Sequence, residues 1–232
     1  MKTYSVSGTA GAGKSTVAGM IGGKDVAFAG ALKVLCQEVF GVTREQLHDP
    51  ALKNVAFEVP VTLTSDHVEH LLRLMPTFVQ GIDYPSAADL AAFIGMDEGP
   101  FTLNTPRELM QFVGTELIRT GVRDDWHALS VLNSIGDAEV VVVSDARFPN
   151  ELAFLLSRFP EHVPIFIERP GVELGGDAGK HKSETCVEEV REMVAGNSRG
   201  VVVVNDGTVD DLRAKIAPVS YTHLTLPTNR EV

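Results

Sequence analysis

The sequence predicts an α/β protein with a doubly wound, five-stranded and mainly parallel sheet. Two observations predict this class: short apolar runs that lack polar alternation, and helical patterns between them. The runs are Tyr4–Ser7, Val26–Ala29, Val140–Ser144, Pro164–Glu168 and Val201–Asn205. Unbroken apolarity is typical of strands that are buried on both faces, and parallel strands need helical crossovers between them.

Helical patterns separate these runs as the fold requires. They cover Ser15–Ile21, Ala31–Phe40, Asn150–Phe159, Thr185–Val194 and Val209–Ile216. In the second of them, Leu32, Leu35 and Val39 share one side, and Gly41 provides a stop signal. We therefore expect each run to be followed or preceded by a helix that covers the sheet.

Residues 42–135 interrupt this alternation and predict an insertion. The segment contains several prolines and reads as mostly helical, so we expect a substrate-binding lobe between the second and third strands. Its clearest element is 105–120, where Thr105 is a good N-cap, Pro106 suits the first helical position and Glu108 can complete a capping box. The core of a single domain, 1–218, would then consist of 1–41 and 136–218.

Composition narrows the classes of partner. The chain has 232 residues, of which 44% are apolar, and 20 Lys and Arg against 31 Asp and Glu give a net charge of −11. Polymeric nucleic acid is therefore a poor partner, because binding it requires a basic face, whereas a mononucleotide needs only a few converging cations. No apolar run is long enough to cross a membrane and no signal peptide is evident, so we expect no membrane contact.

The sequence contains two cysteines and an irregular C-terminal segment. Cys36 and Cys186 are the only cysteines, and two isolated thiols suggest a reducing cytoplasm. Residues 219–232 show no periodicity and read as a non-native, disordered tail that can be removed.

The strongest functional signal is the segment Gly8–Ser15. Its sequence, GTAGAGKS, fits the phosphate-binding P-loop pattern G-x-x-x-x-G-K-[ST], and it lies between a predicted strand and a predicted helix. Glycines allow the backbone N–H groups to converge on phosphates, and the helix N-terminus adds positive potential. The sequence therefore predicts ATP binding by Gly11, Ala12, Gly13, Lys14, Ser15 and Thr16, with Lys14 at the β- and γ-phosphates.

An acidic residue at the end of the third strand predicts a magnesium site. The apolar run from Val140 ends at Asp145, which is the Walker-B arrangement. We expect the Ser15 hydroxyl and Asp145 to serve Mg²⁺, the cofactor of ATP-dependent phosphotransfer. A GTPase is disfavoured, because the sequence has no guanine-reading Asn-Lys-x-Asp and Asp145 does not begin an Asp-x-x-Gly switch.

Several further segments resemble the deoxynucleoside monophosphate kinases of bacteriophages. They are TPRELMQFVGTEL from Thr105, SDARFPNE from Ser144, HKSE from His181 and NDGT from Asn205. The resemblance covers the P-loop and most of 105–217, and it implies transfer of a phosphoryl group from Mg-ATP to a deoxynucleoside 5′-monophosphate. It also implies a lid at about 169–184, a host-cytoplasm location if the source is a phage, and a homodimer as the family's expected assembly.

The resemblance assigns the acceptor side residue by residue. Arg107 corresponds to the arginine on the substrate phosphate, and Arg169 in the lid is a candidate to cross the transferring phosphoryl group. Asn205 falls in a loop that would contact ATP. The remaining substrate-binding positions are Lys33, Gly114, Thr115, Trp126, Asp145, Arg147 and Glu151.

Simpler interpretations compete at some of these positions. Trp126, taken alone, is more often a packing residue, and Arg147 with Glu151 could form a surface ion pair. Arg107 at the second position of a capped helix opposes the helix dipole, so helix stability does not explain it. Two other functions stay open: another small-molecule kinase, of the dephospho-coenzyme-A or phosphomevalonate type, and a nucleotide switch without enzymatic activity.

Overall fold

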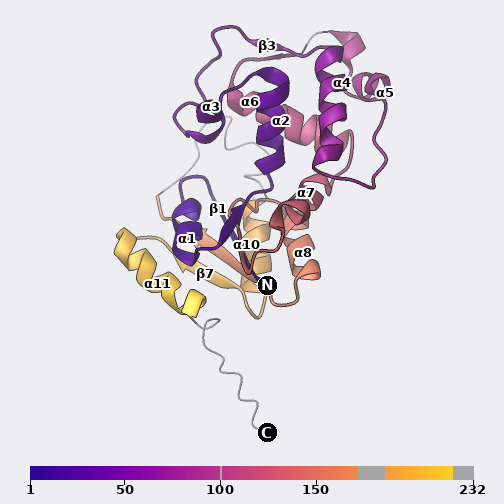
Figure 1. The fold of residues 1–232 in the computed structure, drawn as a ribbon. Helices are drawn as coiled ribbons and strands as arrows, with labels where there is room; N and C mark the ends of the chain where they lie inside the picture. Colours follow the sequence, from indigo (N-terminus) through magenta and orange to yellow (C-terminus); the bar gives the residue numbers. More distant parts are fainter. Residues whose placement is uncertain (100, 172–185, 222–232) are drawn as a thin grey trace. The chain divides into compact units, whose positions relative to one another are not determined.

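The computed structural model describes residues 1–99, 101–171 and 186–221. The chain divides into two compact units (Figure 1). Unit 1 comprises residues 1–27 and 135–232, and unit 2 comprises residues 28–134. Within the described ranges, no helix has the length and apolarity needed to cross a bilayer.

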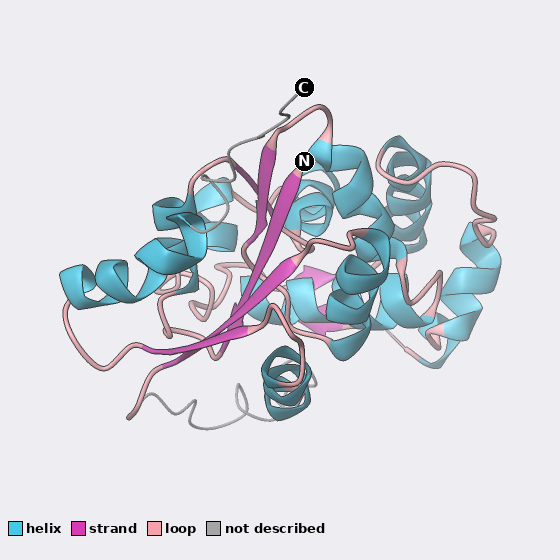
Figure 2. Cartoon of the chain, turned by 90° about the horizontal axis from the view of Figure 1, so that it is seen from below, coloured by secondary structure: helices cyan, strands magenta, loops and turns pink. Residues whose placement is uncertain are grey.

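A five-stranded, all-parallel sheet forms the centre of unit 1, as the sequence predicts. Its strands are β1 (Lys2–Gly8), β2 (Lys24–Val26), β5 (Val140–Val143), β6 (Val163–Glu168) and β7 (Val201–Val204). Their order is β2-β5-β1-β6-β7, so β1 is central and β5 and β6 are its neighbours. Figure 2 shows the twisted sheet in magenta.

Helices cover both faces of this sheet, which is compatible with a doubly wound fold. They are α1 (Lys14–Ile21), α8 (Pro149–Arg158), α10 (Val187–Ala195) and α11 (Val209–Tyr221). Tyr4 and Val6 of β1 pack with residues of α1 and α11, whereas Phe166 of β6 packs with Leu152 of α8 and Val190 of α10. Alternate residues of a strand point to opposite faces, so these two clusters lie on the two sides of the sheet.

The second strand begins earlier than the sequence suggested. We expected Val26–Ala29, but β2 pairs with β5 over Lys24–Val26. The last bond of this edge is donated by Ser144 N to Val26 O, and Phe28 is already part of unit 2. The apolar run was misleading because it continues past the strand into a different core.

One face of the central strand is unexpectedly polar. Thr3, Ser5 and Ser7 are buried, and His162 lies between two of them, with Nδ1 3.0 Å from Thr3 Oγ1 and Nε2 2.9 Å from Ser5 Oγ. Within the described part of the chain, the Ser7 hydroxyl has no hydrogen-bond partner. Burial lowers the pKa of His162 from 6.5 to about 4, so this histidine is neutral in the folded protein near neutral pH.

The C-terminal helix extends beyond the boundary expected from the sequence. Residues from 219 onward were predicted to be disordered and dispensable, but α11 continues through Pro218 to Tyr221. Val219 is buried in the same cluster as Leu212 and Ile216, because residues three and seven positions apart share a helix face. The prediction was therefore wrong for 219–221, and residues 222–232 lie outside the described ranges.

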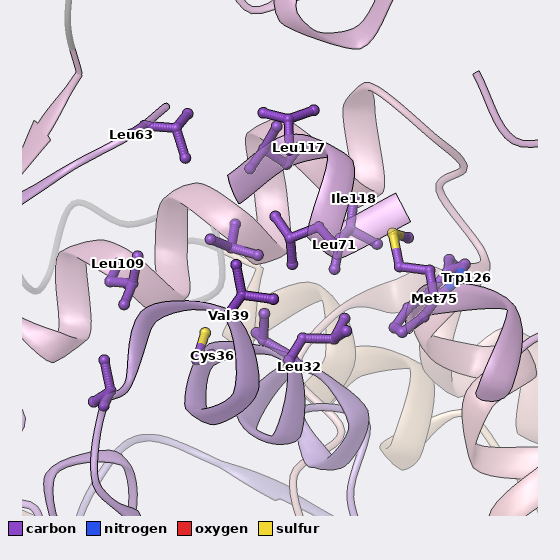
Figure 3. Packing of buried hydrophobic residues seen from close by; sticks show 14 of the residues in the cluster. Leu32, Cys36, Val39, Leu63, Leu71, Met75, Leu109, Leu117, Ile118 and Trp126 are labelled. Atoms are coloured by element: carbon purple, nitrogen blue, oxygen red, sulfur yellow. The ribbon is translucent and has the colours of Figure 1, made fainter. Parts of the chain in front are cut away.

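Unit 2 is mostly helical, as expected of the insertion. Its helices are α2 (Gly30–Phe40), α3 (Arg44–His48), α4 (Ser65–Leu74), α5 (Ala87–Phe93), α6 (Pro106–Gln111) and α7 (Trp126–Ile135), with short 3₁₀ turns η1 (Met75–Thr77) and η2 (Met96–Glu98). A two-stranded antiparallel sheet, β3 (Val61–Thr62) with β4 (Thr102–Leu103), was not predicted. A large apolar cluster occupies the centre of this unit, and Figure 3 shows part of it.

Helix α2 belongs to this unit rather than to the sheet unit. The sequence placed 28–41 in the core, because a helix following a strand usually covers the same sheet. In the structure Leu32, Leu35 and Val39 pack into the cluster of unit 2, and α2 contacts α4 and α6. The helix ends as expected at Gly41, which adopts a left-handed conformation with φ 67°.

The expected helix over 105–120 changes its geometry midway. Thr105 caps α6 and its hydroxyl accepts from Glu108 N at 3.1 Å, but Glu108 bonds Asn104 N at 2.7 Å rather than the N-cap residue. From Phe112 to Thr120 the chain continues as a π-helix, η3. Stretches of π-helix are rare and often occur at functional sites. An apolar period of 3.6 residues predicts an α-helix, so the sequence does not reveal this change of geometry.

Candidate functional site

The loop Gly8–Ser15 leaves the carboxyl end of the central strand and leads into α1. Three of its residues have positive φ: Gly8 at 137°, Gly11 at 78° and Gly13 at 105°. A Cβ at Gly8 would lie 2.3 Å from Ile167 O, and one at Gly13 would lie 2.8 Å from Asn205 Nδ2. Glycine is therefore required at both positions by backbone conformation and by close packing.

Lys14 extends its ammonium group over this loop. Its Nζ donates to Gly8 O at 2.8 Å and to Thr9 O at 2.7 Å, and the side chain is half-buried. The first turn of α1 carries exposed Ser15 and Thr16 and no acidic residue. The loop thus presents an ammonium group, two hydroxyls and the positive end of a helix, which together favour an anionic ligand.

Asn205 supports the loop from behind. Its Nδ2 donates to Ala12 O at 2.8 Å, and its backbone N donates to Glu168 O at 2.6 Å. The side chain is buried, so its observed function is to hold the loop backbone. The sequence suggested direct contact with ATP, whereas the structure shows a contact with the loop that would bind it.

Arg169 lies at the edge of the same loop. It follows β6 directly, is exposed, and places Nη1 3.5 Å from Gly11 O. The preceding Glu168 forms an ion pair with Arg191 of α10, which fixes the end of the strand. The rest of the predicted lid, at 172–184, lies outside the described residues.

Asp145 and Arg147 lie between β5 and α8, and Glu151 lies in the first turn of α8. Ser5 pairs with Val143, so Asp145 reaches the same edge of the sheet as the Gly8–Ser15 loop. Glu151 has only 4% of its surface exposed, and its Oε2 accepts from Arg147 N at 3.0 Å and Phe148 N at 3.1 Å. This carboxylate therefore satisfies backbone N–H groups just before the start of α8.

A hard cation fits the donors at this edge. The Ser15 hydroxyl and the Asp145 carboxylate are oxygen donors, which Mg²⁺ prefers, and Mg²⁺ characteristically keeps only one or two protein ligands beside waters and phosphates. Within the described residues, no group of three His, Cys, Asp or Glu side chains forms a complete metal site. The arrangement thus suits a metal that arrives with a phosphate ligand.

The remaining predicted residues belong to unit 2. Arg107, at the start of α6, donates from its backbone N to Lys53 O at 3.0 Å and from Nε to Asn54 Oδ1 at 2.7 Å. Lys33 lies in the first turn of α2. No sequence-based prediction covers Lys53 or His48, because nothing in 42–100 resembles a known motif.

The pKa of His48 is lowered from its ordinary value by the surroundings of the imidazole. Burial is the largest cause of the lowered pKa of His48. The positive charges of Lys33, Arg44 and Lys53 lower this pKa further, while Glu45 raises it. These cations are therefore close enough to act on one imidazole. Unit 2 brings together cations that are far apart in the sequence, which no local motif could reveal.

Trp126 and Gly114 have packing functions in this structure. Trp126 is 0% exposed within the apolar cluster (Figure 3). Its Nε1 donates to Tyr84 Oη at 3.0 Å. A base cannot stack on a ring whose faces are covered by protein, so the expected base contact is not supported. A Cβ at Gly114 would lie 2.8 Å from Leu32 Cδ2, which explains this glycine by the close approach of α2 and η3.

The structure thus distributes the predicted residues over two units. Unit 1 holds the Gly8–Ser15 loop, Asp145, Arg169 and Asn205, together with Arg147 just before α8 and Glu151 in its first turn. Unit 2 holds Lys33, Arg107, Gly114, Thr115 and Trp126. Thr115 is half-buried on η3. No family model matches the sequence, and the search of curated proteins finds no match.

Proposed function

We propose that this chain is a kinase that uses Mg-ATP to phosphorylate deoxynucleoside 5′-monophosphates. The observation that carries this proposal is the Gly8–Ser15 loop, in which Lys14 Nζ lies at the carbonyls of Gly8 and Thr9 beside the uncapped start of α1. A strand–glycine loop–helix unit of this sequence is the phosphate-binding element of P-loop proteins. The doubly wound sheet agrees with that assignment.

The donor side follows from the contacts in unit 1. Lys14 would exchange its bonds to Gly8 O and Thr9 O for oxygens of the β- and γ-phosphates, and the loop N–H groups would bind the remaining oxygens. Asn205 keeps the loop in shape by holding Ala12 O. Arg169 would stabilise negative charge on the transferring group from its place beside Gly11.

The metal would be held by Ser15 and Asp145. When bound, Mg²⁺ neutralises negative charge on the phosphates and orients them. In a second function, Asp145 would orient Arg147, two residues later in the same segment, or the substrate. These two functions of Asp145 are separable, because only the first depends on the metal.

The chemistry itself needs no general base. An oxygen of the acceptor's 5′-phosphate, already ionised near neutral pH, forms a bond to the γ-phosphorus as the bond to the β–γ bridging oxygen breaks. ADP leaves with that electron pair, and the acceptor becomes a diphosphate. The protein's contribution is to position the two groups in line and to neutralise their repulsion.

The choice of acceptor rests on sequence features. The segments at Thr105, Ser144 and Asn205 resemble deoxynucleoside monophosphate kinases, and Arg107 lies on unit 2 with other cations nearby. A few cations on one unit of a chain with a net charge of −11 suit a small anion better than a nucleic acid.

A coupled assay of ADP release tests this function. The acceptors are dTMP, dGMP, dCMP, dAMP and GMP, each with Mg-ATP. We expect turnover with at least one deoxynucleotide and little with GMP. If ATP binds but no monophosphate accelerates its consumption, the kinase assignment is wrong and another small-molecule P-loop kinase becomes the better proposal.

A further inference from the structure

Four cationic or protonatable side chains gather on unit 2, and we call them the acceptor cluster. Its members are Lys33, His48, Lys53 and Arg107. They come from the first turn of α2, the last residue of α3, the turn that follows it, and the first turn of α6. Only Lys33 and Arg107 were expected from the sequence.

The packing of three helices holds these segments together. Helix α2 contacts both α3 and α6, and α3 contacts α6 (Figure 1). The turn carrying Lys53 is tied to α6 through the bond that Arg107 N donates to Lys53 O at 3.0 Å. Tertiary contacts therefore hold together the backbone segments that carry the cluster.

Arg107 is held in a defined orientation. Its Nε donates to Asn54 Oδ1 at 2.7 Å, so one edge of the guanidinium is fixed. For the Nη groups, no partner is found among the described residues. A guanidinium has five donors, and a fork of free N–H groups matches the oxygens of a phosphate.

We propose that the acceptor cluster binds the 5′-phosphate of the monophosphate, with Lys53 and His48 as binding residues beside Lys33 and Arg107. This inference rests on the proposed function, and it adds the residues that recognise the acceptor's anionic end. Arg107 would make the directional bonds, whereas Lys33 and Lys53 would supply charge. His48 would donate a hydrogen bond at the rim.

The electrostatics agree with this assignment. Lys33 and Lys53 come from different segments and both act on the imidazole of His48, so the structure places these cations close together. The same cations that depress the pKa of His48 would be neutralised by a bound dianion. Arg107 also opposes the dipole of the helix on which it lies, which indicates a function outside helix stability.

The test compares Lys53→Met with Arg73→Met in the intact chain. Lys53→Met removes a charge but keeps the backbone carbonyl that accepts from Arg107 N, and Arg73 is an exposed cation of α4 in the same unit. Calorimetric titrations measure the Kd of dTMP, dGMP, dCMP, dAMP, inorganic phosphate and Mg-ATP. We expect Lys53→Met to weaken monophosphate binding about tenfold or more, as for a lost hydrogen bond to a charged group.

The other binding constants separate the outcomes. ATP affinity should stay unchanged in Lys53→Met, Arg73→Met should resemble the wild type throughout, and His48→Gln should weaken monophosphate binding less than Lys53→Met. Unchanged monophosphate binding in both Lys53→Met and Arg107→Met would overturn the inference while wild-type turnover still supports the kinase. The inference is also overturned if the wild type binds neither a monophosphate nor phosphate. Cluster-dependent binding without any turnover would instead retain the anion site and reject the kinase.

Discussion

The two units present functional groups in opposite ways. In unit 1, the Gly8–Ser15 loop lies within eight consecutive residues and is shaped by backbone conformation, with glycines at φ values of 78° to 137°. In unit 2, the acceptor cluster draws on residues from 33 to 107 and depends on how α2, α3 and α6 pack. Local chemistry can therefore be recognised in a sequence pattern, whereas an assembled surface needs the tertiary structure.

The largest effect should come from the loop. Replacing Lys14 with Ala removes the ammonium that bonds Gly8 O and Thr9 O, and ATP-dependent turnover should fall by about a hundredfold to a thousandfold, as for loss of one preorganised charge-stabilising donor. Lys24→Ala, an exposed lysine of the same unit, is the matched control. Turnover is measured by ADP release. Unimpaired turnover in Lys14→Ala would show that the loop is not the functional element of unit 1.

Unit 1 should also be the more acid-sensitive of the two. His162 is 1% exposed, and its pKa is about 4 in the folded state against an ordinary value of 6.5. Between these values the unfolded chain binds a proton that the folded chain does not, so stability is complete above about pH 6.5 and is lost as the pH falls toward 4. The expected loss is about 3 kcal/mol, at about 1.4 kcal/mol for each pH unit.

Hydrogen exchange of β1 and β6 peptides measures this loss. The control is His162→Gln, which keeps a polar side chain near Thr3 and Ser5 but cannot titrate. Exchange in these strands should depend less on pH in His162→Gln than in the wild type. Equal pH dependence in both proteins would show that His162 does not link acid to the stability of unit 1.

Unit 2 should be the more sensitive to added volume. A Cβ at Gly114 would lie 2.8 Å from Leu32 Cδ2, so Gly114→Ala should destabilise this unit by about 1–3 kcal/mol through overpacking. Trp126 is the only tryptophan and is buried in the same core, so its fluorescence during urea unfolding reports on unit 2. An exposed glycine with open space around it, Gly19 of α1, provides the comparison, and Gly19→Ala should leave the tryptophan transition unchanged.

The smallest effect should come from the support of the loop. Asn205→Ala removes the bond to Ala12 O, and the KM for ATP should rise by about fivefold, corresponding to about 1 kcal/mol. Asn197, whose Oδ1 accepts from Arg199 N in an exposed turn of the same unit, is the control. If Asn205→Ala changed acceptor binding rather than ATP binding, Asn205 would have a function beyond loop support.

Two of the predicted site residues have contacts in the structure that the sequence did not indicate. Trp126 was assigned to the nucleotide by position in a motif, but the packing of α7 encloses its ring beside Met75 (Figure 3). Glu151 was expected to line the acceptor site, and the structure shows its carboxylate accepting from two backbone N–H groups just before α8. In both cases the residue type allowed two functions, and only burial and hydrogen-bond partners distinguish them.

The sequence by itself determined the parallel sheet, its helices and the glycine loop. Apolar runs report burial on both faces, and glycine spacing reports a backbone that only glycine can adopt, so both are local properties. Only the tertiary structure decided that α2 joins unit 2, that 112–120 is a π-helix, and that His48 and Lys53 lie with Lys33 and Arg107. The place of α2 and the gathering of the cations depend on contacts between residues far apart in the chain, and such contacts leave no periodic signal in the sequence.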